Sequence, residues 1–166
     1  FWFFSLDLKS SKKSAQKIIL NWINRNSRYN KESWEFDTTA KRIISWLSNH
    51  QLSYNGGDKE FRSIFDHMIQ KQTNHLINEI KNSKNLENKI IGCSAIILSG
   101  LCYKIDKNYL NFGINFLKKI TKYSLDNQGF VKSRNIKQQI FFLKYFILIR
   151  EWFKESQVEI PNHIEE

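Results

Sequence analysis

The sequence predicts an all-α fold, and three observations lead to that prediction. The 166 residues include one proline and six glycines, so residues that interrupt helices are rare. Apolar residues recur every three to four positions, as along one face of a helix, and no stretch alternates like a half-buried strand. The 13 phenylalanines, 6 tyrosines and 5 tryptophans supply the apolar surface of a folded core. A chain of this length suits one domain.

The first three helices are expected at about 10–26, 38–52 and 59–81. A polar loop at 27–33 follows the first, and the second is expected to start at an N-cap, Asp37 or Thr38. Residues 55–58, Asn-Gly-Gly-Asp, form the clearest loop of the chain. Each helix carries an apolar stripe at helical spacing: Ala15, Ile18, Ile19, Trp22 and Ile23; then Ile43, Ile44, Trp46 and Leu47; then Phe61, Ile64, Phe65, Met68, Leu76 and Ile80.

The other three helices are expected at about 86–101, 106–125 and 135–155. The fourth is apolar around most of its surface, and its small residues at 92–95 allow another helix to come close. The fifth has a one-sided stripe of Leu110, Ile114, Leu117 and Ile120, and a turn follows at 126–129. The sixth holds the most apolar run, 140–149, which is too short to span a bilayer. We therefore expect a buried core helix there and no membrane span.

Helices of this length joined by short loops predict consecutive αα-hairpins. Residues 1–157 are expected to form one domain, and residues 158–166 a frayed acidic tail. Periodicity alone leaves open whether the hairpins close as a bundle, stack as a solenoid or form part of a toroid.

The chain is strongly basic, with a formal net charge of +10. Such a charge indicates a polyanionic partner or an acidic neighbouring domain, and nucleic acid, anionic polysaccharide and a membrane surface all fit. The basic residues are densest at 9–17, 118–122 and 132–137. No nucleic-acid-binding motif accompanies them.

The cysteines and histidines give no sign of a metal site or a cofactor. Cys93 and Cys102 fall in or beside one predicted helix, too far apart for a disulfide, and both are expected in the core. The four histidines show no ligand spacing and are expected to have no functional role. We therefore predict neither a metal nor a cofactor.

Two segments resemble stretches of the heparinase II/III family of polysaccharide lyases. Residues 32–47 are similar to a family stretch that reads roughly W-E-P-Y-P-x-S-x-R-I-x-N-W, and the matching positions are Trp34, Glu35, Arg42, Ile43 and Trp46. Residues 126–137 are similar to D-G-G-H-F-E-R-S-P-M-Y-H, and an apolar helix follows in both. The matches there are Asp126, Phe130 and Ser133, with Lys132 in place of the arginine.

Three weaker similarities fall in the same order along the chain. Residues 1–6 resemble the family's aromatic Y-N-L-H-Y-F-D segment, residues 19–26 its W-I-x-x-N segment, and residues 88–100 its N-H-L-x-x-N-x-x-A-L-x-x-A-G helix. The resemblance thus covers nearly the whole chain.

The resemblance implies an (α/α) toroid, normally followed by a β-sandwich domain. Six helices are fewer than a full toroid needs, so we expect an incomplete ring, with the β-sandwich domain of the same protein as a partner. The family cleaves uronate-containing polysaccharides by β-elimination, in which a base removes the C5 proton and a tyrosine protonates the leaving oxygen. By resemblance the protein is periplasmic or secreted, with the cytoplasm as the alternative.

The catalytic residues do not carry over completely. The family's tyrosine falls on Ile136, which can neither donate nor accept a proton, and the following histidine falls on Lys137. The second asparagine of the fourth helix falls on Gly92. Catalytic residues therefore stay unassigned, with Tyr123 or Tyr145 as alternative proton donors. Both a lyase and a catalytically degenerate glycan-binding domain remain open.

Seven residues are candidates for substrate binding. Trp34 would stack on a sugar and Glu35 would bind its hydroxyls, or both would form a structural hinge. Arg42 would clamp a carboxylate, or pair internally with Glu35. Asn88, from the family's asparagine-histidine pair, would bind substrate, cap a helix or lie on the surface. Lys132, Arg134 and Lys137 would line the sugar groove, or form an exposed basic loop.

Overall fold

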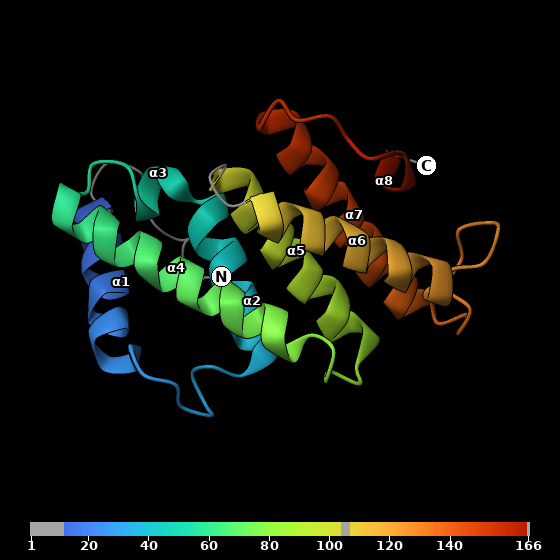
Figure 1. Cartoon of the computed structure of the whole chain (residues 1–166), viewed down its shortest axis with the longest axis horizontal. Helices are drawn as coiled ribbons and strands as arrows, with labels where there is room; N and C mark the ends of the chain where they lie inside the picture. Colours follow the sequence, from blue (N-terminus) through green and yellow to red (C-terminus); the bar gives the residue numbers. More distant parts are fainter. Residues whose placement is uncertain (1–11, 104–106, 166) are drawn as a thin grey trace.

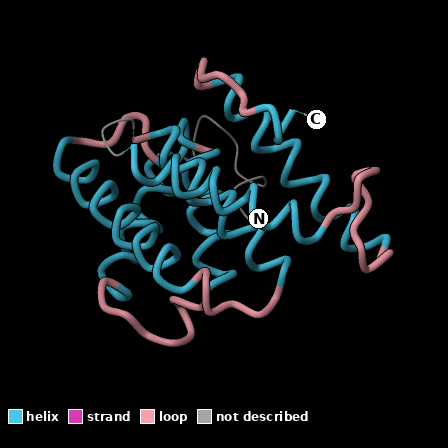
Figure 2. The backbone as a smooth tube through the Cα atoms, turned by 45° about the vertical axis from the view of Figure 1, so that its right-hand side comes forward, coloured by secondary structure: helices cyan, strands magenta, loops and turns pink. Residues whose placement is uncertain are grey.

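The computed structural model describes residues 12–103 and 107–165, and every regular element in them is a helix (Figure 2). The elements are α1 (Lys12–Asn26), α2 (Phe36–Ser48), α3 (His50–Ser53), α4 (Lys59–Glu79), α5 (Leu86–Cys102), α6 (Lys107–Ser124), α7 (Ile136–Glu155) and α8 (Asn162–Glu165). The predicted all-α class is confirmed, and the six long helices correspond to the six predicted ones. Residues 1–6 and Asp106, on which part of the predictions fell, lie outside the described residues.

Three of the long helices, α2, α5 and α7, run in the same direction and form a row (Figure 1). In that view each begins at its lower end and rises toward the upper left. The helix that precedes each of them along the chain, α1, α4 or α6, runs in the opposite sense, so the chain is a succession of αα-hairpins. Helix α5 lies at the centre and packs against α2, α4, α6 and α7.

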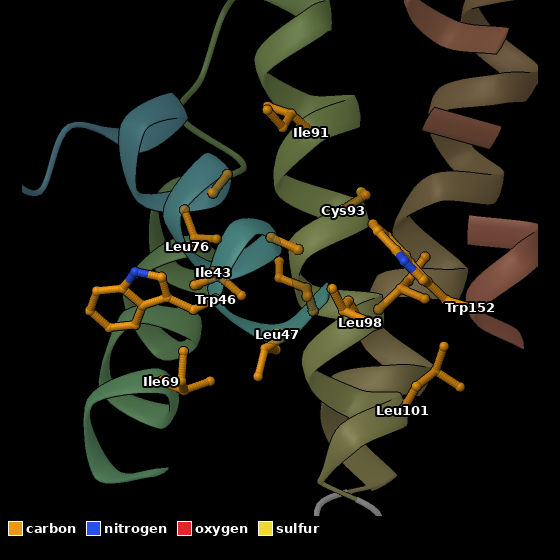
Figure 3. Packing of buried hydrophobic residues seen from close by; sticks show 14 of the residues in the cluster. Ile43, Trp46, Leu47, Ile69, Leu76, Ile91, Cys93, Leu98, Leu101 and Trp152 are labelled. Carbon is orange, nitrogen blue, oxygen red and sulfur yellow. The ribbon is translucent and has the colours of Figure 1, made fainter. Parts of the chain in front are cut away.

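The core is built around α5, whose residues 90–101 are all buried. Figure 3 shows side chains of α2, α4, α5 and α7 gathered in one cluster, among them Ile43, Leu76, Leu98 and Trp152. Gly100 lets α6 approach, because a Cβ added there would lie 2.5 Å from the backbone nitrogen of Leu110. Of the small residues at 92–95 that were predicted to admit a neighbouring helix, Gly92 lies at such a contact, because a Cβ added there would lie 2.5 Å from the ring of Phe36 in α2.

The second predicted helix is interrupted. It begins two residues early, at Phe36, with Glu35 rather than Asp37 or Thr38 in the N-cap position. It ends at Ser48, and the short helix α3 follows after Asn49. The side-chain amide of Asn49 donates to the carbonyl oxygen of Ser45 at 2.8 Å, a local bond of the kind that competes with helix continuation.

Three other predictions need correction. Helix α7 is not fully buried, because Ile140, Leu143 and Ile147 on one face are 62%, 54% and 51% exposed. The segment after residue 157 is not a frayed end, because Ile164 in α8 is buried and α8 packs on α7. Cys93 is buried as expected, whereas Cys102 is exposed. In the part of the chain that the structure describes, no helix is long and apolar enough to cross a bilayer.

Candidate functional site

The segments that carry the resemblance include or adjoin the starts of α2, α5 and α7, which lie along the same side of the molecule (Figure 1). Phe36 at the start of α2 packs against Gly92, where an added Cβ would lie 2.5 Å from its ring. Burial and the nearby charge of Asp37 raise the pKa of Tyr145 in α7.

The contact between Phe36 and Gly92 shows that α5 begins before the level at which α2 begins. Gly92 lies six residues into α5, or about 9 Å at 1.5 Å per residue. We call the side of the molecule formed by the starts of α2, α5 and α7 the stepped edge.

Trp34 is buried at this edge. Its ring is 3% exposed, and its Nε1–H donates to the carbonyl oxygen of Asn26 at 3.0 Å. The ring also meets the imidazole of His75 edge-on, at 5.5 Å between centroids. A ring held in this way presents no free face to a sugar, so Trp34 packs as the hinge interpretation expected.

Glu35 is exposed next to Trp34. Its carboxylate accepts a hydrogen bond from the Thr38 hydroxyl at 3.3 Å and makes no capping bond to the helix backbone. The carboxylate therefore has acceptor capacity left for a ligand, and its binding role stays a prediction.

Arg42 is half-buried and holds three parts of the fold together. Its guanidinium carbon lies 3.9 Å from the centre of the Trp22 ring, and Nη1 donates to Gln72 Oε1 at 2.8 Å. Nη2 donates to the carbonyl oxygen of Ser33. Burial lowers the pKa of Arg42 to about 10, so it is still a cation at neutral pH. The expected internal pairing with Glu35 is wrong, and much of the donor capacity of Arg42 is already used.

Asn88 lies half-buried in the first turn of α5. It does not cap the helix, because the side chain of Asn85 accepts from the backbone nitrogens of Glu87 and Asn88. Within the described residues, the amide of Asn88 makes no hydrogen bond of its own, so its role as a ligand stays a prediction.

Residues 126–137, the basic loop, form an ordered turn before α7 and in its first turn. The carboxylate of Asp126 accepts from the backbone nitrogens of Gln128 and Phe130 at 2.9 and 3.0 Å. It also pairs with Arg134 at 2.9 Å. These contacts, first of all the backbone N–H of Phe130, lower the pKa of Asp126. Gln139 closes the turn, because it accepts from Val131 N and donates to Gly129 O.

This turn presents its cations to solvent. Lys132 and Lys137 are exposed, and the side chain of Arg134 is 66% exposed despite its pairing with Asp126. Phe130, 51% exposed, lies beside Arg134, whose guanidinium carbon is 5.7 Å from the ring centre. Ile136, the position of the family's tyrosine, is 75% exposed at the first residue of α7. Figure 1 shows this loop well away from the loop that holds Trp34, along the long axis of the molecule.

A groove that the sequence did not predict lies between the start of α2 and the end of α4. We call it the Tyr29 groove; its volume is about 430 Å³. It is lined by Tyr29, Lys31, Trp34, Glu35, Phe36, His75, Glu79, Asn82 and Ser83. Tyr29 and His75 are not among the substrate-binding residues that the sequence predicts. An aromatic side chain within the polar loop at 27–33 is nevertheless a sequence signal that points to Tyr29.

A larger hollow lies elsewhere in the described part of the chain. It measures about 590 Å³ and is lined by residues of α3 and of the C-terminal ends of α2, α5 and α7. Among the described residues, no group of three or more His, Cys, Asp or Glu side chains is placed to hold a metal ion. No protein-family model, curated protein or solved structure matches this chain.

Proposed function

We propose that this chain is the helical domain of a heparinase II/III-like polysaccharide lyase, and that it binds a uronate-containing anionic polysaccharide along the stepped edge. The observation that carries the proposal is that three segments far apart in sequence lie along the same side of the molecule. Each resembles the family, and each reaches or includes the start of one of the three parallel helices. The proposal includes an incomplete (α/α) toroid, a β-sandwich partner domain and a periplasmic or secreted location.

The charge of the basic loop supports an anionic ligand. The basic loop contains three exposed cations and one carboxylate, and the adjoining α7 begins with backbone N–H groups that favour negative charge. Arginine and lysine side chains are well suited to carboxylate and sulfate groups. A bound uronate or sulfate ester would compete with Asp126 for Arg134.

The choice between a lyase and a binding domain depends on the proton donor. Ile136 cannot act as an acid, and its exposure at the head of α7 favours binding without cleavage. An elimination reaction would need another donor, and Tyr145, within α7, is one candidate. Its raised pKa keeps the phenol protonated, as an acid requires, but the side chain is 7% exposed.

The test is to incubate the protein with heparan sulfate, alginate, hyaluronate or polygalacturonate and follow the ultraviolet absorbance of the unsaturated uronate product. A rise would establish a lyase. Salt-sensitive retention on the immobilised glycans without a rise would establish the binding domain. Equal retention on double-stranded DNA would indicate binding by net charge alone, and no retention on any glycan would contradict the proposal.

A further inference from the structure

We propose that the Tyr29 groove is a sugar subsite that seats one uncharged pyranose ring of the polysaccharide, with Tyr29 as its stacking platform. This inference rests on the proposed function and deepens it, because it names a part of the ligand that the basic loop does not select. The groove adjoins the stepped edge, because Glu35 and Phe36 at the start of α2 belong to both.

The ring of Tyr29 has the exposure that a stacking platform needs. It is 65% exposed, whereas the neighbouring Trp34 is buried. The ring of Tyr29 also makes tilted contacts with the rings of His75 and Trp34, at 5.6 and 6.3 Å between ring centroids. A supported aromatic ring offers a flat apolar surface at low cost in side-chain entropy, and the C–H face of a pyranose is a matching surface.

His75 adds an acceptor for a sugar hydroxyl. Its Nε2 lies 3.0 Å from the carbonyl oxygen of Trp34, and because a carbonyl only accepts, Nε2 must carry the proton. In the neutral ring Nδ1 is therefore the acceptor. Within the described residues His75 makes no second hydrogen bond. The amide of Asn82 and the hydroxyl of Ser83 line the same groove and both donate and accept.

The charges in the groove exclude an acidic sugar. Two carboxylates, Glu35 and Glu79, line it together with one ammonium group, Lys31. Carboxylates accept hydrogen bonds from adjacent hydroxyls but repel a uronate or a sulfate ester. The groove therefore suits the uncharged unit of a polysaccharide in which uronates alternate with neutral sugars, and the basic loop suits the charged unit.

The experiment measures binding of fluorescently labelled oligosaccharides of equal length by fluorescence anisotropy. A hyaluronan oligosaccharide alternates glucuronate with N-acetylglucosamine, whereas an alginate oligosaccharide is charged at every unit. We expect Tyr29→Ala to weaken hyaluronan binding about tenfold, as the loss of one aromatic contact does, and to change alginate binding less than twofold. Tyr29→Phe should bind like the unaltered protein. Leu143→Ala is the control, because Leu143 is 54% exposed and lies outside the groove.

The outcomes separate the two proposals. If the unaltered protein binds hyaluronan and Tyr29→Ala binds it equally well, the subsite is overturned and the proposed function stands. If Tyr29→Ala weakens both ligands equally, the selection of an uncharged ring is overturned. If the unaltered protein binds neither oligosaccharide, the proposed function fails and the subsite fails with it.

Discussion

Arg42 shows how a single side chain can hold a loop and two helices together without an ion pair. Its guanidinium group stacks on the Trp22 ring and donates two hydrogen bonds, and no carboxylate pairs with it among the described residues. A planar guanidinium can stack and donate in two directions at once, which an ammonium group cannot do.

Arg42→Lys is therefore expected to lower the free energy of unfolding by about 1–3 kcal/mol, because the stacking and at least one buried hydrogen bond are lost. Urea denaturation followed by circular dichroism measures the loss. Lys41→Arg, on the exposed side of the same helix, should change the midpoint very little. An unchanged midpoint for Arg42→Lys would contradict a structural role for this residue.

Asp66 joins α4 to two tyrosines, accepting from Tyr103 Oη at 2.7 Å and from Tyr54 Oη at 3.1 Å. Burial, followed by these contacts with Asp66, raises the pKa of both phenols. A raised folded-state pKa means that this stabilisation is fully present below the unfolded pKa of about 10 and is lost as the pH rises above it.

We expect the unaltered protein to lose stability steadily above about pH 10, and Tyr103→Phe to lose less over the same range. Thermal unfolding at neutral and alkaline pH measures the two slopes. At neutral pH the variant should be less stable, because the Asp66 carboxylate loses a donor. Parallel slopes for both proteins would show that Tyr103 does not contribute to the alkaline instability.

At the scale of the helix, a glycine acts on the packing of α5 and two asparagine caps act on the first turns of α5 and α7. Gly100 removes the side chain where the α6 backbone passes α5, and Asn85 and Asn135 cap the first turns of α5 and α7. Each feature is local in sequence, but the glycine acts on a helix contact whereas the caps act on the helix itself.

Gly100→Ala should destabilise the fold by about 1–3 kcal/mol, because the new Cβ overlaps the backbone of Leu110. In a helix without this contact the same change stabilises by about 0.5–1 kcal/mol, so the sign of the effect is diagnostic. Chemical denaturation gives the sign, and Asn111→Ala on the exposed face of α6 is the control. A stabilised variant would rule out the close approach of α6.

Asn135→Ala removes the oxygen that accepts from Lys137 N and Gln138 N at 3.0 and 3.4 Å. A loss of about 1 kcal/mol is expected, as is typical of an N-cap. Asn135→Asp keeps the acceptor and should retain most of the stability. Loss of the cap also loosens the basic loop, so glycan affinity should fall with Asn135→Ala and not with Asn135→Asp.

For the molecule as a whole, the net charge of +10 matters less than where the cations lie. The basic loop gathers three of them at the stepped edge, whereas residues 118–122 carry three on α6. These two clusters differ in position and hardly in charge, which makes them a matched pair for mutation.

On the proposed function, replacing Lys132, Arg134 and Lys137 with glutamine should abolish retention on an anionic glycan at moderate salt and leave the helical signal unchanged. The same replacement at Lys118, Lys119 and Lys122 removes the same charge and should leave most of the retention. Salt elution profiles on an immobilised glycan provide the comparison. An equal loss in both variants would mean that overall charge, and not the stepped edge, attracts the ligand.

Local patterning in the sequence by itself determined the helices of this protein. The run at 90–101 is apolar on most of its surface and became the buried α5, and the helix expected at 135–155 became α7. These features could be predicted because helix spacing and breakers act over a few residues. The break at Asn49 was missed, since its side chain bonds back to the preceding turn without any proline or glycine to mark it.

Only the tertiary structure decided which side chains of the candidate site are available to a ligand. Trp34 and Tyr29 are both aromatic, lie in the same connection and pack against His75 on α4, yet the first is buried and the second exposed. Arg42 likewise found its partners on α1 and α4 rather than at Glu35. Burial and pairing of a side chain depend on which helices, distant in sequence, pack together. The spacing of apolar residues predicts that one face of a helix is buried, but it does not predict which helix packs on that face.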